Sequence, residues 1–579
     1  MFNLSFSDNS CSVRFPKLLL LQIGMTMLVG SCGEMTTTQD ASYVASDPDG
    51  FVGESACIAC HQQAYDDWKG SHHDWAMQLP NDTTVLADFN DVSFEADSVV
   101  YHFSRNDTAY YVKTVGDDGI EHQFKVAYAF GVTPLQQYLI EFPDGKYQTL
   151  RATWDTEKEV WFNQYAGQVI PHDNWLNWTQ GGQRWNTMCA ECHSTNLKKN
   201  YEANTDAFKT TYSVINVSCE ACHGPGLEHV TWAAGDTSIG TPKVLMPGFG
   251  QKAQLNLCAA CHARRVKLTE VIQPDLDFAD QFLIQTISDE YYHPDGQILE
   301  EDYVMGSFMQ SKMYDEGVKC ADCHNMHSME LRAEGNALCL QCHLPNQYNT
   351  PDHHFHKMDT EEASCISCHM TGDFYMGNDF RRDHSFRVPR PDQSVEYDTP
   401  NACIGCHEDQ SNQWAADWIV KWYGTERADH FSDHLLVASK RGYNSEQAQQ
   451  VLAFINDLKY PAIARATAME YYPLSNNDEE LQMILTALKD SSSLIRYQAL
   501  SKLRIYPPNE VLGVALAHIK DSTRLVRIAA ARLIVEIDVN QLEPAQRNAV
   551  IGARQELDHM LNANADFPLG RMQMGDHYM

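Results

Sequence analysis

The sequence predicts a mainly α-helical and irregular fold that carries a small antiparallel β insert and is followed by an all-α stack of helical repeats. Three observations favour this fold. One is a long stretch dense in paired cysteines and histidines, another is a group of short aromatic and β-branched runs inside it, and the third is a pattern that recurs every 31 residues at Arg465, Arg496 and Arg527. Because the chain has 579 residues and a mass of 65.6 kDa, we expect more than one domain.

The composition excludes several classes of function. Hydrophobic residues make up 43% and charged residues 21% of the chain, as in globular rather than disordered proteins. The net charge of −34 argues against a nucleic-acid-binding protein and against a polybasic membrane-surface protein, since both need clustered positive charge. The 18 cysteines and 25 histidines indicate metal ligands or covalently modified thiols.

The N-terminus predicts export. In residues 1–31 two basic residues precede the apolar run Leu18 to Val29, which has the length of a signal peptide's apolar core and is short for a membrane span. The run leads to Cys32 in a sequence that resembles a bacterial lipobox, so we expect cleavage before Cys32 and a lipid tether on its thiol. A plain secretory signal with an incidental cysteine is the alternative. Residues 32–50 are expected to form a flexible tether, and the expected location is the periplasm or outer membrane of a Gram-negative bacterium.

Sixteen of the 18 cysteines form eight pairs, and every pair has the spacing C-x-x-C-H. The cysteines are Cys57 and Cys60, Cys189 and Cys192, Cys219 and Cys222, Cys258 and Cys261, Cys320 and Cys323, Cys339 and Cys342, Cys365 and Cys368, and Cys403 and Cys406. The histidines that follow them are His61, His193, His223, His262, His324, His343, His369 and His407.

This spacing has a mechanical reason. Positions i, i+3 and i+4 share one side of a helical turn, so two thiols can bond the vinyl groups of one haem while the imidazole reaches its iron. The motif is that of c-type haem attachment. Zinc ribbons do not need the histidine each time, thioredoxin-like sites have one reactive pair, and disulfide frameworks vary in spacing. The sequence therefore predicts eight covalent haem c groups, each with its iron on one of these histidines. Because bacteria attach such haems outside the cytoplasmic membrane, this agrees with the predicted export signal.

Other histidines are candidates for the second axial position on each iron. Those at suggestive places near the motifs are His72 (in a His72-His73 pair), His229, His293, His327, His354 and His356 (in a cluster that also holds His353), and His384. His122 and His172 are weaker candidates. The count permits eight bis-histidine haems, and it is equally compatible with one five-coordinate haem.

The stretch from Phe51 to Glu408 resembles the multihaem cytochromes grouped with the cytochrome c-554 family. The opening Phe51-Val52-Gly53-x-x-x-Cys57, followed by Trp68-x-x-Ser71 and then His72 or His73, is similar to that family's opening. Residues 310–324 resemble a segment shared with pentahaem nitrite reductase and octahaem hydroxylamine oxidoreductase. The chain departs from those enzymes, because it has no C-x-x-C-K motif and continues into a different region after its last haem motif. The resemblance thus implies haem packing more than enzyme activity.

The domain boundaries follow from these patterns. We expect a cytochrome domain over 51–425, with the β insert at about 95–165, where the runs 99–113, 121–128 and 146–161 alternate with turn residues. Residues 440–560 resemble HEAT-like repeats and predict a solenoid that docks partner proteins. Residues 561–579 resemble the start of a tetratricopeptide repeat, either truncated or acting as a cap.

Two functions remain open. The first is electron transfer between redox partner proteins, which the acidic chain would recognise through their basic patches. The second is an oxidoreductase that acts on a small nitrogen or sulfur compound at one five-coordinate haem, for which Tyr291, Tyr292, Asp295 and residues 381–383 are the places to look.

Overall fold

The computed structural model describes residues 49–579, except 237, 239, 243–249, 302 and 476. The predicted signal peptide, Cys32 and nearly all of the expected tether lie outside the described residues. Within the described part of the chain, no helix is long and apolar enough to cross a membrane.

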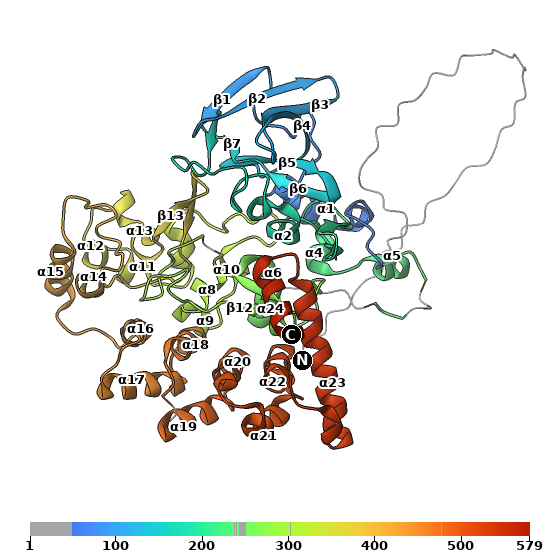
Figure 1. The fold of residues 1–579 in the computed structure, drawn as a ribbon. Coiled ribbons are helices and arrows are strands. Elements are labelled where there is room, and N and C mark those ends of the chain that lie inside the picture. Colours follow the sequence, from blue (N-terminus) through green and yellow to red (C-terminus); the bar gives the residue numbers. More distant parts are fainter. Residues whose placement is uncertain (1–48, 237, 239, 243–249, 302, 476) are drawn as a thin grey trace, which may run out of the picture. The chain divides into compact units, whose positions relative to one another are not determined.

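An eight-stranded antiparallel sheet forms the first large element (Figure 1). Its strands are β1 (Val92–Ala96), β2 (Val99–Asn106), β3 (Ala109–Val115), β4 (Glu121–Phe130), β5 (Leu135–Phe142), β6 (Lys146–Thr149), β7 (Ala152–Asp155) and β8 (Val160–Asn163). They lie in the order β1-β2-β3-β4-β5-β7-β8, with β6 paired to β5. Because β1 also approaches β8, the sheet curves almost into a barrel.

Aromatic side chains fill the inside of this sheet. Phe103 stacks on Trp161 with ring centroids 3.6 Å apart, and Phe89 meets Phe103 and Tyr138 edge to face. Phe103 and Tyr138 are fully buried, so the insert has a hydrophobic core of its own. The predicted antiparallel sheet is confirmed. The prediction missed β1 and β5, and six of the eight residues of β5 are buried in succession, so the strand lacks the alternation by which strands are recognised.

The part of the chain that carries the later motifs consists of short helices and loops, as predicted. After α1 (Ser55–Trp68) come α2 (Trp185–Met188), α3 (Ala190–His193), α4 (Cys219–His223), α5 (Leu227–Ala233), α6 (Gln251–His262), α7 (Phe278–Gln281), α8 (Met305–Phe308), α9 (Lys312–Asp315), α10 (Cys320–Cys323), α11 (Pro345–Tyr348), α12 (Pro351–His354), α13 (Cys365–His369) and α14 (Pro391–Tyr397). Three two-stranded hairpins join them: β9 (Tyr201–Glu202) with β10 (Ala207–Phe208), β11 (Arg265–Lys267) with β12 (Phe282–Ile284), and β13 (Gly372–Tyr375) with β14 (Asp379–Arg382).

Longer helices make up the C-terminal region (Figure 1). They are α15 (Asn412–Tyr423), α16 (Phe431–Ser439), α17 (Ser445–Asn456), α18 (Ala462–Tyr471), α19 (Asp478–Ala487), α20 (Ser493–Lys502), α21 (Pro508–His518), α22 (Arg524–Leu533), α23 (Pro544–Ala563) and α24 (Pro568–Tyr578). The even-numbered helices α16, α18, α20 and α22 contact one another in succession, and α17, α19 and α21 each pack on the helix that follows. Asn444 and Asn477 begin α17 and α19 with capping boxes.

The recurring arginines connect successive helix pairs. Arg465 pairs with Asp490, Arg496 with Asp521, and Arg527 with Glu556. Both side chains of the first pair are only 4% exposed. Each arginine therefore ties one recurrence of the pattern to an acidic residue in the next part of the chain.

The C-terminal segment also contacts the motif region. Lys199 forms a buried ion pair with Asp566, and the side chain of Asn564 donates to the backbone carbonyl of Lys267. Farther along, α7 packs on α22, and Leu268 and Ile287 belong to the same hydrophobic core as the C-terminal helices. The helices are thus fastened to the middle of the chain. Whether residues 561–579 begin another repeat stays a prediction.

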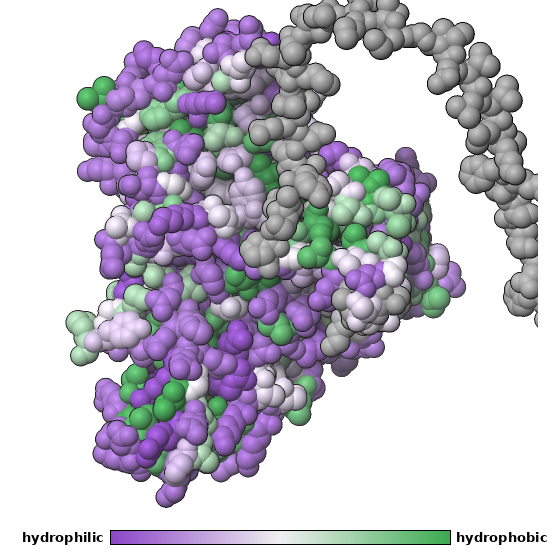
Figure 2. Space-filling model, turned by 90° about the vertical axis from the view of Figure 1, so that its right-hand side faces the viewer, coloured by the Kyte–Doolittle hydropathy of each residue, from purple (hydrophilic) through white to green (hydrophobic). Residues whose placement is uncertain are grey.

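Figure 2 shows one face of the molecule as mostly hydrophilic, with smaller hydrophobic areas between the polar side chains. This agrees with the large excess of acidic residues in the composition. A surface of this kind favours electrostatic rather than hydrophobic recognition.

Candidate haem centres

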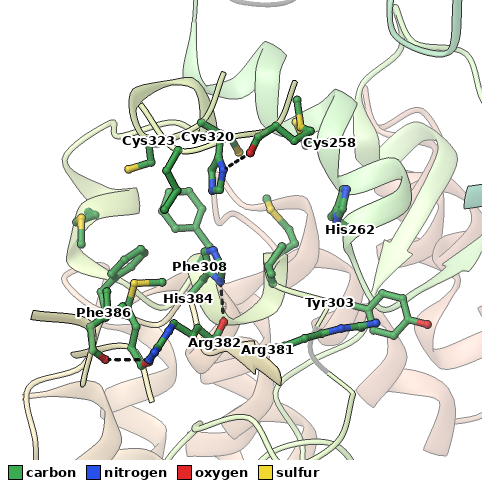
Figure 3. A pocket seen from close by; sticks show the side chains of 18 of the residues that line it. Cys258, His262, Tyr303, Phe308, Cys320, Cys323, Arg381, Arg382, His384 and Phe386 are labelled. Carbon is green, nitrogen blue, oxygen red and sulfur yellow. Dashed lines mark hydrogen bonds between the residues drawn. The ribbon is translucent and has the colours of Figure 1, made fainter. Parts of the chain in front are cut away.

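A continuous cavity of about 2640 Å³ runs through the motif region. It is lined by residues of every motif from Cys189 to His407, although of the cysteines and histidine of the third motif only Cys222 contributes, and Figure 3 shows Cys258, Cys320, His262 and His384 around one part of it. A single small-molecule pocket usually has roughly 300–1,000 Å³. The cavity is therefore large enough for several cofactors, and it lies where the motifs would hold them.

Each motif forms a helical turn or a tight turn in the described chain. The turn at Cys219–His223 is α4, the one at Cys365–His369 is α13, and the last motif at 403–407 lies in a turn. Where the turn is helical, as in α4 and α13, this geometry places the two cysteines and the histidine on one side. We number the sites 1 to 8 in the order of the motifs along the chain.

Five motif histidines face a second histidine. The pairs, with the distance between ring centroids, are His61 and His229 (6.2 Å), His262 and His73 (6.3 Å), His223 and His327 (6.5 Å), His369 and His353 (6.1 Å), and His407 and His356 (6.2 Å). The spacing is nearly constant although the pairs come from unrelated parts of the chain. The nearly constant distance between ring centroids indicates that the five pairs serve the same purpose.

The gap fits one metal ion. An imidazole nitrogen binds a metal ion at roughly 2 Å, so two imidazoles on opposite sides of one ion have nitrogens about 4 Å apart. The ring centroids then lie farther apart by one ring radius on each side, which matches the observed 6.1 to 6.5 Å. The residues present therefore fit the iron of a bis-histidine haem, which supplies a one-electron carrier when bound.

Backbone carbonyls orient several of these imidazoles. Nδ1 hydrogen bonds to a carbonyl oxygen in His193 (Ala76, 3.0 Å), His324 (Met329, 3.0 Å), His356 (His354, 2.5 Å), His369 (Arg387, 2.6 Å) and His384 (Arg382, 2.9 Å). A bond of this kind places the proton on Nδ1 and leaves Nε2 free to bind a metal. The last of these bonds is drawn in Figure 3.

The second histidine of a pair always follows a different motif from the first. His229 comes after motif 3 and faces His61 of motif 1, while His73 comes after motif 1 and faces the histidine of motif 4. His327 follows motif 5 and faces His223 of motif 3. The histidines that face motifs 7 and 8 follow motif 6. Each histidine pair therefore joins the chain segments that follow two different motifs.

The structure brings several of the sequence candidates into these pairs. His229, His327 and His356 face motif histidines. His384 lines the large cavity, as does His324 of site 5; burial lowers the pKa of His384, the carbonyl of Arg382 opposes this, and His324 lowers it further.

In two clusters the structure places a neighbour of the selected residue opposite the motif. His73, and not His72, faces His262, and His353, and not His354, faces His369. His72 and His354 line the large cavity, whereas His293 is not among the described residues that line it. The sequence identified the clusters but held no signal that separates adjacent histidines. The assignment of single ligands remains a prediction.

Two motif histidines face an aromatic ring in place of an imidazole. Among the described residues, His193 of site 2 meets the edge of Phe130 at 5.6 Å, and His343 of site 6 meets Tyr348 at 5.6 Å. Burial lowers the pKa of His193. The carbonyl of Ala76 and the carboxylate of Glu301 partly offset this by raising the pKa.

Charged and polar groups surround site 2. Glu301 pairs with Arg381 at 2.9 Å, and both affect the pKa of His193. Burial raises the pKa of Tyr303, and Glu301 and Cys192 raise it further. Of the places proposed for an enzyme site, Arg381 and Arg382 line the large cavity. The described residues Tyr291, Tyr292, Asp295 and Asp383 lie outside that lining.

The cysteines show which sites are neighbours. Thiols of different motifs shift each other's pKa, which places Cys57 near Cys219, Cys192 near Cys261, Cys258 near Cys320, and Cys339 near Cys365. Weaker electrostatic effects on the pKa place Cys222 in the neighbourhood of Cys258, Cys323 in that of Cys342, and Cys368 in that of Cys403. The sites therefore follow the order 1, 3, 4, 5, 6, 7, 8, and site 2 joins at site 4, where the sulfur of Cys192 lies 3.7 Å from the carbonyl of Cys261.

Comparisons with known proteins give matches to family models and to a solved structure. A family model described as cytochrome c554 and c-prime matches residues 56–97 and 171–224, and a model described as a doubled CXXCH motif matches residues 312–347. The outer cell wall cytochrome OcwA is a solved structure with a TM-score of 0.44 and 16% sequence identity, and the similarity covers 78% of this chain and 100% of that one. No curated protein matches the chain. The family matches support a multihaem c-type cytochrome with covalently attached haem c.

Proposed function

From the premise that the chain is a multihaem c-type cytochrome, we propose that it carries eight haem c groups and transfers electrons among them outside the cytoplasmic membrane. The observation that carries this proposal is the set of five histidine pairs at a constant spacing. Imidazoles on both sides of an iron leave it no open position for a substrate. Sites of this kind suit electron transfer and not chemistry on a bound molecule.

The contacts between motifs support transfer along the chain of sites. Because cysteines of consecutive sites lie near one another, the haems attached to them would be neighbours. The protein's contribution is to hold these groups in place and to tune them with axial ligands and their hydrogen bonds. The series 1-3-4-5-6-7-8 has two ends, and electrons would enter at one end and leave at the other.

The acidic charge and the C-terminal helices indicate the partners. A net charge of −34 favours redox proteins with basic patches. The stacked helices and their arginine pairs support a HEAT-like solenoid as the docking region. Lipidation of Cys32 would tether the protein to a membrane, with the periplasm or outer membrane of a Gram-negative bacterium as its location.

A second candidate function is an oxidoreductase reaction at site 2 on a small nitrogen or sulfur compound. Site 2 lies beside the series of sites, and His193 faces Phe130 in place of a second imidazole. Glu301, Arg381 and Tyr303 lie around it and could bind an anion or supply protons.

Two measurements on the purified protein test these proposals. A pyridine haemochrome assay should give eight haems per chain, and fewer would contradict the first proposal. Electron paramagnetic resonance of the oxidised protein should show mainly low-spin signals. A high-spin signal that shifts when nitrite or hydroxylamine is added would favour the second function.

A further inference from the structure

Arg387 connects site 7 to the C-terminal helices. Its backbone carbonyl accepts a hydrogen bond from Nδ1 of His369 at 2.6 Å. Its side chain extends the other way, and its guanidinium group lies 5.4 Å from the ring of Phe431, the first residue of α16. One residue thus contacts both a motif histidine and the helical region.

The side chain of Arg387 is held firmly. Its Nη2 donates to the backbone carbonyl of Asp295 at 2.6 Å and to Oε1 of Gln310 at 3.0 Å. Gly296 has a φ of +91°, and a Cβ there would lie 2.8 Å from Nη2 of Arg387 and 2.5 Å from Oε1 of Gln310. The backbone at Gly296 therefore approaches so closely that a side chain would displace the guanidinium group.

A second set of contacts ties the same stretch of chain to α16. The guanidinium group of Arg390 forms two hydrogen bonds with Asp433, at 2.7 and 3.2 Å. Gln393 donates to Oγ of Ser432 at 2.9 Å. These bonds join the chain after site 7 to the start of α16.

The opposite imidazole of site 7 is also fastened from this side. His353 faces His369 at 6.1 Å, and the hydroxyl of Tyr423 donates to the backbone carbonyl of His353 at 2.5 Å. Tyr423 is the last residue of α15, which leads into α16. The imidazole of His369 and the backbone of His353 are therefore each bonded by a residue next to the helical region.

A hydrogen bond from Nδ1 strengthens the imidazole as an electron donor, which favours ferric iron and lowers the reduction potential. We propose that Arg387 is a positioning residue that fixes the imidazole of His369 and couples the reduction potential of site 7 to the packing of α16. This inference rests on the proposed function, since it requires a haem at site 7. It also implies that a protein bound to the C-terminal helices changes the potential of this one haem.

The test is a redox titration of the haem-loaded full chain, followed by electron paramagnetic resonance. In Arg387→Met the carbonyl loses its anchor, so we expect one haem in eight to become easier to reduce. Its ratio of oxidised to reduced iron at a fixed potential should change about tenfold, which corresponds to about 59 mV for one electron. Phe431→Leu should shift the same haem in the same direction, by less.

Arg441→Met is the matched control. Arg441 also forms an ion pair, with Asp289 at 2.7 Å, and lies 4.7 Å from the ring of Tyr471, but it contacts no motif residue that the structure describes. It should leave all potentials unchanged. Unchanged potentials in both Arg387→Met and Phe431→Leu, or an equal shift in the control, would overturn the proposal. A haem count below eight in the unaltered chain would instead contradict the proposed function.

Discussion

The motif region and the C-terminal helices differ in what holds them together. Between residues 293 and 430, the buried hydrophobic residues of the described chain are Phe308, Ala363, Ala415 and Ala416. The helices from residue 431 onward form one dense core of aliphatic and aromatic side chains instead. One region has a core made of protein, and the other encloses a cavity lined by cofactor-binding residues. In the motif region the haems themselves must supply the buried apolar surface that a chain otherwise provides.

The largest expected effect therefore comes from withholding haem. When the chain is produced where no haem is attached, we expect limited proteolysis to cut between residues 300 and 430. The sheet and the helices from 431 to 563 should resist, because each has a hydrophobic core of its own. Mass spectrometry of the fragments checks this, with the haem-loaded protein as control. Equal resistance across the whole chain would contradict the contrast between the regions.

In the helical region, the buried pair of Arg465 and Asp490 should matter most. In Arg465→Met, Asp490 keeps its charge in a site where its side chain is 4% exposed, which should cost about 3–5 kcal/mol of unfolding free energy. Lys459→Met is the control, because Lys459 pairs with Asp429 with 58% of its side chain exposed, and such pairs contribute about 0–1 kcal/mol. Denaturation followed by circular dichroism measures both. Similar losses in the two variants would show that burial does not decide the effect.

His430, the residue that precedes α16, should make the unfolding free energy of the protein depend on pH. Burial, and then Arg387, lowers the pKa of His430 to about 4, whereas an unfolded histidine has a pKa of about 6.5. Between these values the unfolded chain binds the proton and the folded chain does not, so stability falls as the pH drops from 6.5 to 4 and is constant above. Asp433 and Asp295 oppose the shift, and Arg390 adds to it.

The lowered pKa of His430 changes the unfolding free energy by on the order of 3 kcal/mol across this pH range. His430→Asn keeps a capping side chain for α16 but removes the titration. Its unfolding free energy should depend less on pH between 4 and 6.5 than that of the unaltered chain. The same dependence in both proteins would exclude His430 as its source.

Substitutions of the adjacent histidines His72 and His73 have the smallest expected energetic effect, but they give the clearest test of which histidine is the ligand. His73→Leu should convert one haem, at site 4, from low to high spin, because His73 faces His262. His72→Leu should leave the spectrum unchanged, although the two histidines are adjacent. Electron paramagnetic resonance of both variants distinguishes them, and a high-spin signal in His72→Leu would reverse the assignment.

The two regions also differ in what their sequences reveal. Attachment of haem is encoded within five residues, so each motif could be recognised directly, as at Cys57, Cys60 and His61. The second ligand is not local. His73 and His262 are far apart in the sequence, and only the folded chain shows that His73 and not His72 turns toward the site. The helical pattern was visible because its arginines repeat, while their acidic partners, such as Asp490, emerged only with the packing.

Each motif histidine of a pair faces a histidine that follows another motif, and this has a consequence for biogenesis. If the chain crosses the cytoplasmic membrane N-terminus first, as the proposed function requires, His61 is exported before the facing His229, whereas His262 is exported after the facing His73. A haem attached at His61 during export would therefore lack its second imidazole until His229 has followed. On the proposed function, rapid translocation or a chaperone that shields this first porphyrin would shorten that period.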